Sequence, residues 1–174
     1  IQEVILTGVN TGDFGRGTDM NFLQLLQQLD RQEEIARFRI SSIEPNLLTD
    51  EIIAFCAASP KFMHHFHIPL QSGSDRILGL MRRRYTTARF AERIAAVRRL
   101  MPDAFIGIDV IVGFPGETEA DFEELLAFVR EVRFERLGVF PYSEEEGTWS
   151  AENLRDDIPE TIKQQRAERV MALQ

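Results

Sequence analysis

The sequence contains a single cysteine, Cys56, among its 174 residues. One thiol cannot form a disulfide within the chain, and it cannot supply the several thiolates of a cysteine-based metal site. Cys56 stands between Phe55 and Ala57 in a helical pattern. We therefore interpret it as a small residue of the hydrophobic core and exclude a disulfide-stabilised fold.

The sequence also lacks long apolar runs and an excess of positive charge. No run approaches the roughly 20 apolar residues of a membrane-spanning helix, and the beginning has no signal-peptide pattern. With 28 acidic and 20 basic residues, the net charge is −8. This charge repels nucleic acid, so a polynucleotide would need local arginines such as Arg82, Arg83 and Arg84, or segments outside this chain. We expect a cytoplasmic globular protein with no membrane partner.

The apolar residues alternate between strand and helix patterns. β-rich runs occupy residues 4–9, 38–43, 66–70, 105–112 and 137–140. Apolar residues recur at helical spacing in "FLQLLQQL", "RFAERIAAVRRLM" and "DFEELLAFV". Thr49, Ser74 and Thr118 stand where helix N-caps are expected, and Thr118 to Asp121 resembles a capping box with aspartate in the return position. This order predicts an α/β protein with parallel strands and outer helices. Five units are too few for a closed barrel, so we predict a partial (β/α) barrel, with a doubly wound open sheet as the alternative.

Ligands of parallel α/β proteins gather at the carboxyl ends of the strands. Small polar residues follow every predicted strand, in "TGVN", "SSIEP", "QSGS", "GFPGE" and "YS". Ordinary turn chemistry explains most of them one by one. It explains less well Gln71, and Asp109 inside an apolar run, because a buried carboxylate is costly without a partner. Asp109 either pairs with an arginine such as Arg83 or binds a hydroxyl group or cation, and both interpretations stay open.

Three glycines, Gly8, Gly73 and Gly113, occupy comparable places after their strands. Without a side chain, their main-chain groups can approach a ligand closely. In "VIVGFPGETEADF", a flat heterocycle along residues 110–113 would be covered by Phe114, while Pro115 fixes the turn. A loop that only turns the chain is the alternative. His64, His65 and His67 invite a metal hypothesis, but they precede the strand end, so we predict no metal ligand among them.

Taken together, five stretches make the chain similar to a known family. "EVILTGVNTGDFG", "RFRISSIEPNLLTDEII", "HFHIPLQSGSDRILGLMRRRYT", "DVIVGFPGETEADFEELLAFV" and "VFPYSEEEGT" resemble, in this order, the radical S-adenosylmethionine methylthiotransferases. The resemblance implies two 4Fe–4S clusters, an electron donor, and S-adenosylmethionine cleaved to a deoxyadenosyl radical, with sulfur from the second cluster. It implies no catalytic side chain here. The cofactor-binding residues it implies are Thr7, Gly8, Asn10, Ser42, Glu44, Gln71, Ser72, Gly73, Arg83, Asp109, Gly113, Phe114, Pro115 and Tyr142.

Within that family, "LTGVNTGDFG" and "HFHIPLQSGSD" are most similar to the enzymes that methylthiolate threonylcarbamoyladenosine beside the tRNA anticodon. "RLGVFPYSEEEGT" is similar instead to the branch that modifies an aspartate of a small-subunit ribosomal protein. Trp149 stands where the family more often has proline or another small residue. Alternatives from other classes are a metal-dependent barrel hydrolase using His65, His67 and Asp109, and a non-catalytic binding module.

The family's CxxxCxxC cluster motif does not occur in the sequence. The family's upstream domain and its C-terminal nucleic-acid-binding domain have no counterpart either. Residue 1 is not methionine, and the sequence stops inside a helical pattern. We therefore expect residues 1–174 to be a partial radical S-adenosylmethionine core domain without its first unit, inactive by itself because a thiolate-ligated cluster needs those sulfurs.

Overall fold

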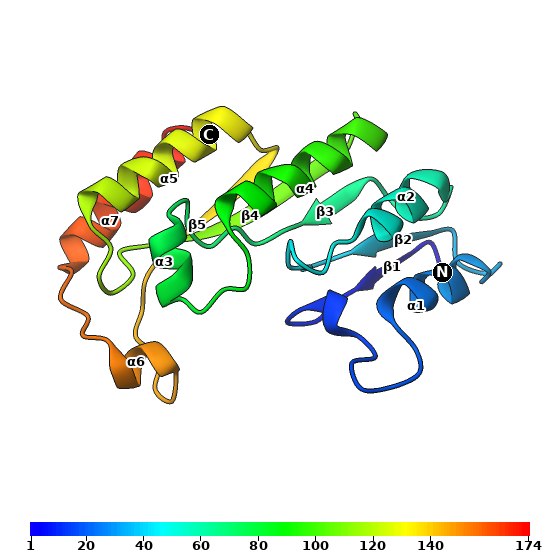
Figure 1. Cartoon of the computed structure of the whole chain (residues 1–174). Coiled ribbons are helices and arrows are strands. Elements are labelled where there is room, and N and C mark those ends of the chain that lie inside the picture. The colour runs from blue at the N-terminus through cyan, green and yellow to red at the C-terminus, as the bar shows by residue number, and fades with distance from the viewer. The chain divides into compact units, whose positions relative to one another are not determined.

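The computed structural model describes all residues, 1–174, and they form two compact units (Figure 1). The first unit comprises residues Ile1–Pro69 and Arg89–Gly107, and the second comprises Leu70–Ala88 and Ile108–Gln174. The boundary falls inside strand β4, between Gly107 and Ile108. Each unit is described by itself.

The first unit is built on short parallel strands. Its elements are β1 (Glu3–Leu6), the 3-10 helix η1 (Thr11–Asp13), α1 (Phe22–Asp30), β2 (Arg37–Ile40), α2 (Asp50–Ala58), β3 (His65–His67), most of α4 (Thr87–Leu100) and the start of β4 (Phe105–Val112). β1 pairs in parallel with β2, Val4 opposite Phe38, and β3 pairs in parallel with β4, Phe66 opposite Ile106. The predicted parallel arrangement is confirmed in this unit.

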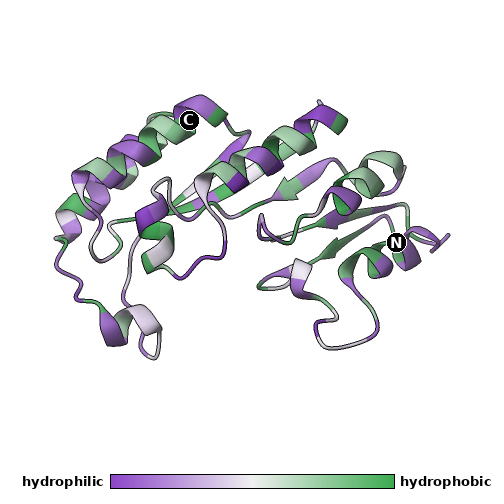
Figure 2. Cartoon of the chain, viewed as in Figure 1, coloured by the Kyte–Doolittle hydropathy of each residue, from purple (hydrophilic) through white to green (hydrophobic).

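Buried aromatic residues form the core of the first unit. Phe38 and Phe62 are almost fully buried, and their rings stack with centroids 5.2 Å apart. Offset stacks of this kind stabilise a core beyond the area that they bury. α2 begins as predicted, with the Thr49 side chain accepting a hydrogen bond from the Ile52 amide. In α4, Phe90 and Ile94 belong to the buried apolar face, and Figure 2 shows hydrophobic and hydrophilic residues alternating along this helix.

The second unit holds the remaining elements. They are α3 (Asp75–Leu80), the end of β4, α5 (Glu119–Val132), β5 (Arg136–Pro141), α6 (Trp149–Asn153) and α7 (Glu160–Met171). β5 is the neighbour of β4, and the Tyr142 amide donates to the Val112 carbonyl at 2.8 Å. α5 and α7 lie side by side, joined by ion pairs from Arg166 and Arg169 to Glu119 (Figure 1). No helix was predicted from the residues of α6.

α5 begins with the capping box that the sequence predicts. The Thr118 side chain accepts from the Asp121 amide, and the Asp121 carboxylate accepts from the Thr118 amide. The predicted N-cap position of Ser74 is confirmed, but its side chain has another role. Ser74 is the N-cap residue of α3, but its hydroxyl makes no cap and instead donates to Asp121 Oδ1 at 2.7 Å.

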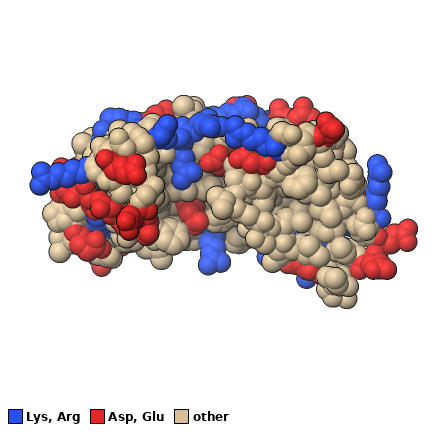
Figure 3. All heavy atoms as spheres, turned by 90° about the horizontal axis from the view of Figure 1, so that it is seen from below, with Lys and Arg blue, Asp and Glu red and all other residues tan.

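Each of the five predicted β-rich runs overlaps an observed strand, and the strand pairings leave the sheets open. This confirms an α/β fold with a partial, unclosed set of parallel strands. None of the helices has both the length and the apolar character to span a membrane. On the face drawn in Figure 3, arginine and lysine side chains lie among acidic ones. A negative net charge therefore still leaves local clusters of arginine on the surface.

Candidate functional site

In the first unit, the residues that follow β1 line a cavity of about 580 Å³. Thr7, Gly8 and Asn10 belong to its wall, together with apolar residues such as Ile5 and Phe14. Ile5 and Phe14 are 50% and 43% exposed. The strand end thus opens into a hollow with both polar main-chain groups and apolar side chains.

Asn10 joins the ends of β1 and β2. Its amide oxygen accepts from the Glu44 main-chain N–H at 3.2 Å, and its amide nitrogen donates to carboxylate oxygens of Glu44 at 3.3 Å and Asp13 at 3.1 Å. The Ser42 carbonyl accepts from both the amide and the hydroxyl of Thr11. The structure therefore brings Asn10, Ser42 and Glu44 together, as the sequence predicts. Two carboxylates beside an open cavity suit a cationic group such as an ammonium.

In the second unit, a cavity of about 380 Å³ opens beside the ends of β4 and β5. Phe114 and Tyr142 form its buried floor, with ring centroids 5.1 Å apart and the rings edge to face. Ile111 and Arg83 also line it. A rigid aromatic floor with arginine side chains in the wall fits a flat heterocycle that carries polar groups. Of the predicted residues, Arg83, Phe114 and Tyr142 are thus brought together.

The other six predicted residues of the second unit lie outside the cavity lining: Gln71, Ser72, Gly73, Asp109, Gly113 and Pro115. Gln71 has a positive φ of 68° and exchanges main-chain hydrogen bonds with Asp109 and Ile111. Ser72 is 1% exposed, and its hydroxyl accepts from the Ser74 amide. Asp109 lies against Gly138, where a side chain on that glycine would meet the Asp109 carboxylate. Gln71 thus continues the parallel pairing as a bridge opposite Val110, and Ser72 is buried against the residue that begins α3.

Gly73 differs from its expected role. A Cβ atom at Gly73 would collide with the main chain of Leu125 in α5. The missing side chain therefore allows α3 and α5 to pack closely, and the ligand approach that the sequence suggested is not needed to explain it.

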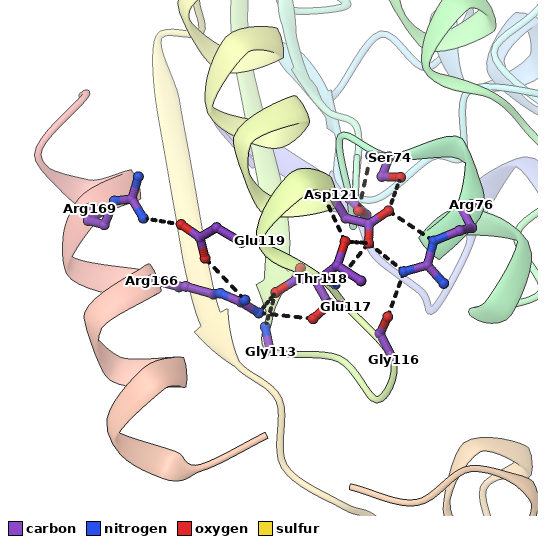
Figure 4. A network of polar contacts seen from close by, with 11 residues as sticks. Ser74, Arg76, Gly113, Gly116, Glu117, Thr118, Glu119, Asp121, Arg166 and Arg169 are labelled. Carbon is purple, nitrogen blue, oxygen red and sulfur yellow. Dashed lines mark hydrogen bonds and ion pairs between the residues drawn. The ribbon is translucent and has the colours of Figure 1, made fainter. Parts of the chain in front are cut away.

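In the loop after β4, the side chain of Glu117 accepts a hydrogen bond from the main chain at the start of the same loop (Figure 4). The Gly113 amide donates to Glu117 Oε2 at 2.7 Å, and Arg166 Nη1 of α7 donates to the same oxygen at 2.6 Å. Gly113 has a φ of 73°, and the Lys163 side chain fills the space that a Cβ would take. Phe114 lines the cavity, whereas Pro115 is buried outside its lining. No pattern in the sequence points to Arg166, which lies 49 positions from Glu117.

Burial raises the pKa of Glu117, because the hydrogen bond from Gly113 and the charge of Arg166 offset its desolvation only in part. Asp121 behaves in the opposite way. Its burial raises the pKa, but hydrogen bonds from Arg76, Thr118 and Ser74 outweigh that and hold the pKa well below its usual range. Asp121 thus fixes the start of α5, and Arg76 Nη2 also donates to the Gly116 carbonyl at 2.6 Å (Figure 4).

Cys56 is fully buried, and burial raises the pKa of its thiol to about 12. A metal–thiolate bond needs a deprotonated, accessible sulfur. No group of three or more histidine, cysteine or carboxylate side chains could hold a metal ion. His64 pairs with Asp103, and His65 stacks on Phe105. The residues present therefore do not fit an iron–sulfur cluster, nor the metal site that a barrel hydrolase would need.

We expect Cys56 to resist alkylation by iodoacetamide at pH 8 in the folded chain, and to react fully once urea unfolds it, because only the exposed thiolate is nucleophilic. Intact-mass spectrometry over time measures this, with glutathione in the same tube as the reactive control. Labelling of the folded chain at the glutathione rate would contradict a core role for Cys56.

This fold and these motifs define the class of protein. The family model of the radical SAM superfamily matches residues 1–129, and the chain belongs to that family. Its members use S-adenosylmethionine and a 4Fe–4S cluster. The chain is 45% identical over 174 residues to the threonylcarbamoyladenosine tRNA methylthiotransferase MtaB of Bacillus subtilis, covering 99% of this chain and 38% of that protein.

A second relative is the tRNA-2-methylthio-N(6)-dimethylallyladenosine synthase of Bifidobacterium adolescentis. It is 45% identical over 175 residues, which cover 99% of this chain and 36% of the relative. The chain therefore spans well under half of the length of these two proteins.

Solved structures share the fold. Coproporphyrinogen III oxidase (HemN) of Escherichia coli, described as a radical SAM enzyme, superposes with a TM-score of 0.70 at 18% identity, over 87% of this chain and 36% of that one. The archaeal Elp3 of Methanocaldococcus infernus gives a TM-score of 0.63 at 13% identity, over 98% of this chain and 44% of that one. These similarities establish the fold alone.

The cavity of the second unit fits part of S-adenosylmethionine. Its floor of Phe114 and Tyr142 suits an adenine ring. Taken by itself, the cavity of the first unit has Asn10 and Asp13 in its lining, and an acidic lining of this kind suits a positively charged group. The aromatic floor of the second unit by itself thus agrees with the nucleoside part of the family's sulfonium cofactor, whereas no residues of this chain fit as ligands of the cluster.

Proposed function

We propose that this chain is the partial core domain of a radical S-adenosylmethionine methylthiotransferase that modifies threonylcarbamoyladenosine in tRNA. The observation that carries the proposal is the 45% identity to the Bacillus subtilis enzyme across 99% of the chain. Identity at this level across nearly the whole chain supports a shared chemistry more strongly than the fold, which hosts unrelated reactions. The parent protein is a transferase that works in the cytoplasm on tRNA and takes electrons from a donor.

A second candidate substrate is tRNA dimethylallyladenosine. The Bifidobacterium relative named for that nucleoside is also 45% identical, again over 99% of the chain. A third candidate, an aspartate of a ribosomal protein, rests only on the similarity of "RLGVFPYSEEEGT" to that branch. All three share the replacement of a hydrogen by a methylthio group.

The chain's own residues bind and orient the cofactor. Phe114 and Tyr142 hold the adenine, with Gly113 and Pro115 shaping the loop beneath it and Arg83 and Asp109 as polar neighbours. The remaining predicted contacts, to the methionine and ribose parts, are Thr7, Gly8, Asn10, Ser42, Glu44, Gln71, Ser72 and Gly73. Two 4Fe–4S clusters, bound by segments outside this chain, supply the electron and the sulfur.

The test is anaerobic reconstitution of the full-length protein that contains this chain with iron and sulfide. It is then incubated with S-adenosylmethionine, a reductant and tRNA from a strain without methylthiotransferases. We expect a nucleoside whose mass corresponds to methylthio-threonylcarbamoyladenosine, measured by liquid chromatography and mass spectrometry of digested tRNA.

Two control substrates separate the candidates. Transcripts that carry dimethylallyladenosine report the second candidate, and small-subunit ribosomal proteins report the third. A mass change confined to either control would replace the proposed substrate. No mass change in any of the three, with both clusters present, would end the methylthiotransferase proposal.

A further inference from the structure

Two exposed aromatic residues stand at the mouth of the second unit's cavity. Phe140 and Trp149 line it, and they are 54% and 39% exposed. The second unit has only one other large hydrophobic residue with comparable exposure, Met171. Isolated exposed apolar residues need no explanation, but two aromatic rings at one opening form a surface for a flat ligand. The floor below them, Phe114 and Tyr142, is buried, so mouth and floor are separate surfaces.

The third part of the mouth is Arg82, which occupies a position where glycine is usual. α3 ends in a Schellman motif: the Arg83 amide donates to the Leu78 carbonyl at 2.9 Å and the Arg82 amide to the Gly79 carbonyl at 3.0 Å. Arg82 is therefore left-handed, with a φ of 58°. A side chain at this position is disfavoured, so its presence points to a use for the side chain. The Arg82 guanidinium carbon lies 5.3 Å from the Trp149 ring centroid.

Trp149 is held in place by local structure. It is the first residue of α6, which is capped by the Thr148 side chain accepting from the Ala151 amide. The Tyr142 hydroxyl donates to Ser150 Oγ at 3.2 Å, which ties α6 to the cavity floor. The indole is therefore presented at the opening instead of being free to collapse into it.

The charge at the opening favours an anionic ligand. Two arginines, Arg82 and Arg83, line the cavity against one carboxylate, Glu145. This local excess contrasts with the net charge of −8 for the chain. Proteins bind unpaired nucleotides with aromatic rings next to arginine. The base stacks on the ring or the guanidinium, and the phosphate lies near the positive charge.

We propose that Trp149 and Arg82 form a base-stacking site for an unpaired nucleotide of the RNA substrate, next to the nucleoside that is modified. The inference rests on the proposed function, because it names the part of the tRNA that this opening holds. The base stacks on the surface that the Trp149 indole and the Arg82 guanidinium form. Phe140 lies beside this surface, and the charge of Arg82 attracts the nucleotide's phosphate. The cofactor's adenine belongs to the buried floor.

The test measures RNA binding and needs no turnover. A fluorescein-labelled anticodon stem-loop RNA that carries threonylcarbamoyladenosine is titrated with the full-length protein, and anisotropy gives the Kd. We expect Trp149→Ala to raise the Kd by about 5- to 150-fold, the loss of one stacked base. Trp149→Phe is expected to restore most of the affinity, since a phenyl ring still stacks.

Arg82→Gly is a second variant whose folding is secure, because glycine is the preferred residue at a left-handed helix end. We expect it to weaken binding and to make the slope of log Kd against log salt shallower by about 0.7, the value for one phosphate contact on a single strand. Trp149→Ala should leave that slope unchanged. Met171→Ala removes an equally exposed side chain outside the cavity and should bind RNA as the wild type does.

The outcomes separate this inference from the proposed function. Wild-type RNA affinity in both Trp149→Ala and Arg82→Gly, in a protein that modifies tRNA, would overturn the stacking site and leave the function standing. A loss of S-adenosylmethionine binding by equilibrium dialysis, with RNA binding unchanged, would assign the mouth to the cofactor and also overturn it. A wild-type protein that neither binds nor modifies the RNA would remove both proposals.

Discussion

Arg166→Met is expected to lower the free energy of unfolding by about 3–5 kcal/mol, the usual effect of removing one partner of a buried ion pair. Both side chains are nearly inaccessible: Arg166 is 8% and Glu117 1% exposed. Methionine keeps most of the volume but leaves the Glu117 carboxylate with the Gly113 amide as its remaining close donor. Urea denaturation followed by circular dichroism measures the loss, and hydrogen exchange of residues 113–117 locates it.

The loss should depend on pH with a definite sign. The pKa of Glu117 is already raised by burial, and removing Arg166 raises it further. A carboxyl whose folded pKa lies above its unfolded value binds protons more tightly when folded, so its stability contribution is present at low pH and is lost as pH rises through the folded pKa. The deficit of Arg166→Met should therefore shrink toward the ordinary pKa of glutamate, about 4.3, and grow above it.

Arg169→Met is the matched control on the same helix. Arg169 is 46% exposed and pairs with Glu119 and Glu123, which are 61% and 51% exposed. Exposed pairs contribute little, so a loss of no more than about 1 kcal/mol is expected. Equal losses from Arg166→Met and Arg169→Met would contradict the role given to burial. The double variant Glu117→Gln with Arg166→Met should regain part of the stability, because no charge is then left buried.

Gly73→Ala is expected to cost about 3 kcal/mol, the upper end of the usual range for overpacking. The added methyl group meets the main chain of Leu125, which cannot rotate away as a side chain could, so α5 must shift as a whole. Denaturation in urea gives the free energy, and increased hydrogen exchange in residues 119–132 reports the displacement of α5.

Gly79→Ala provides the comparison at a helical glycine. Gly79 lies in α3, and nothing stands within 4 Å of the Cβ it would gain. Alanine favours a helix over glycine by about 1 kcal/mol, so this variant should be as stable as the wild type or more stable. Destabilisation by Gly79→Ala as large as that by Gly73→Ala would mean that the contact with α5 is not the cause.

Local patterns predicted the fold well because the residues that form them are close together in the sequence. The Thr118–Asp121 capping box lies within four positions and was confirmed. The five apolar runs needed only their own composition to be recognised as strands. The failures involve partners far apart in sequence. Ser74 was assigned a cap, but its hydroxyl is used by Asp121, 47 positions away.

The candidate site divides in the same way. The sequence placed Phe114 and Tyr142 at one ligand surface, and both line one cavity. The sequence could not show that the Gly113 amide donates a hydrogen bond to Glu117, because the same Glu117 oxygen also accepts from Arg166 of α7, far away in the sequence. Gly73 shows the same limit: the sequence alone does not distinguish a glycine that allows a helix to pack closely from a glycine that allows a ligand to approach.

The loop at residues 113–117 depends on α7 for its structure. This dependence limits where the sequences of two family members can be joined. The superfamily match ends at residue 129, whereas the helix that holds the loop runs from Glu160 to Met171. Chimaeras that join two relatives near residue 130 would take the loop from one parent and the arginine that holds it, Arg166 of α7, from the other. A crossover point placed after residue 171 takes both the loop and α7 from the same parent.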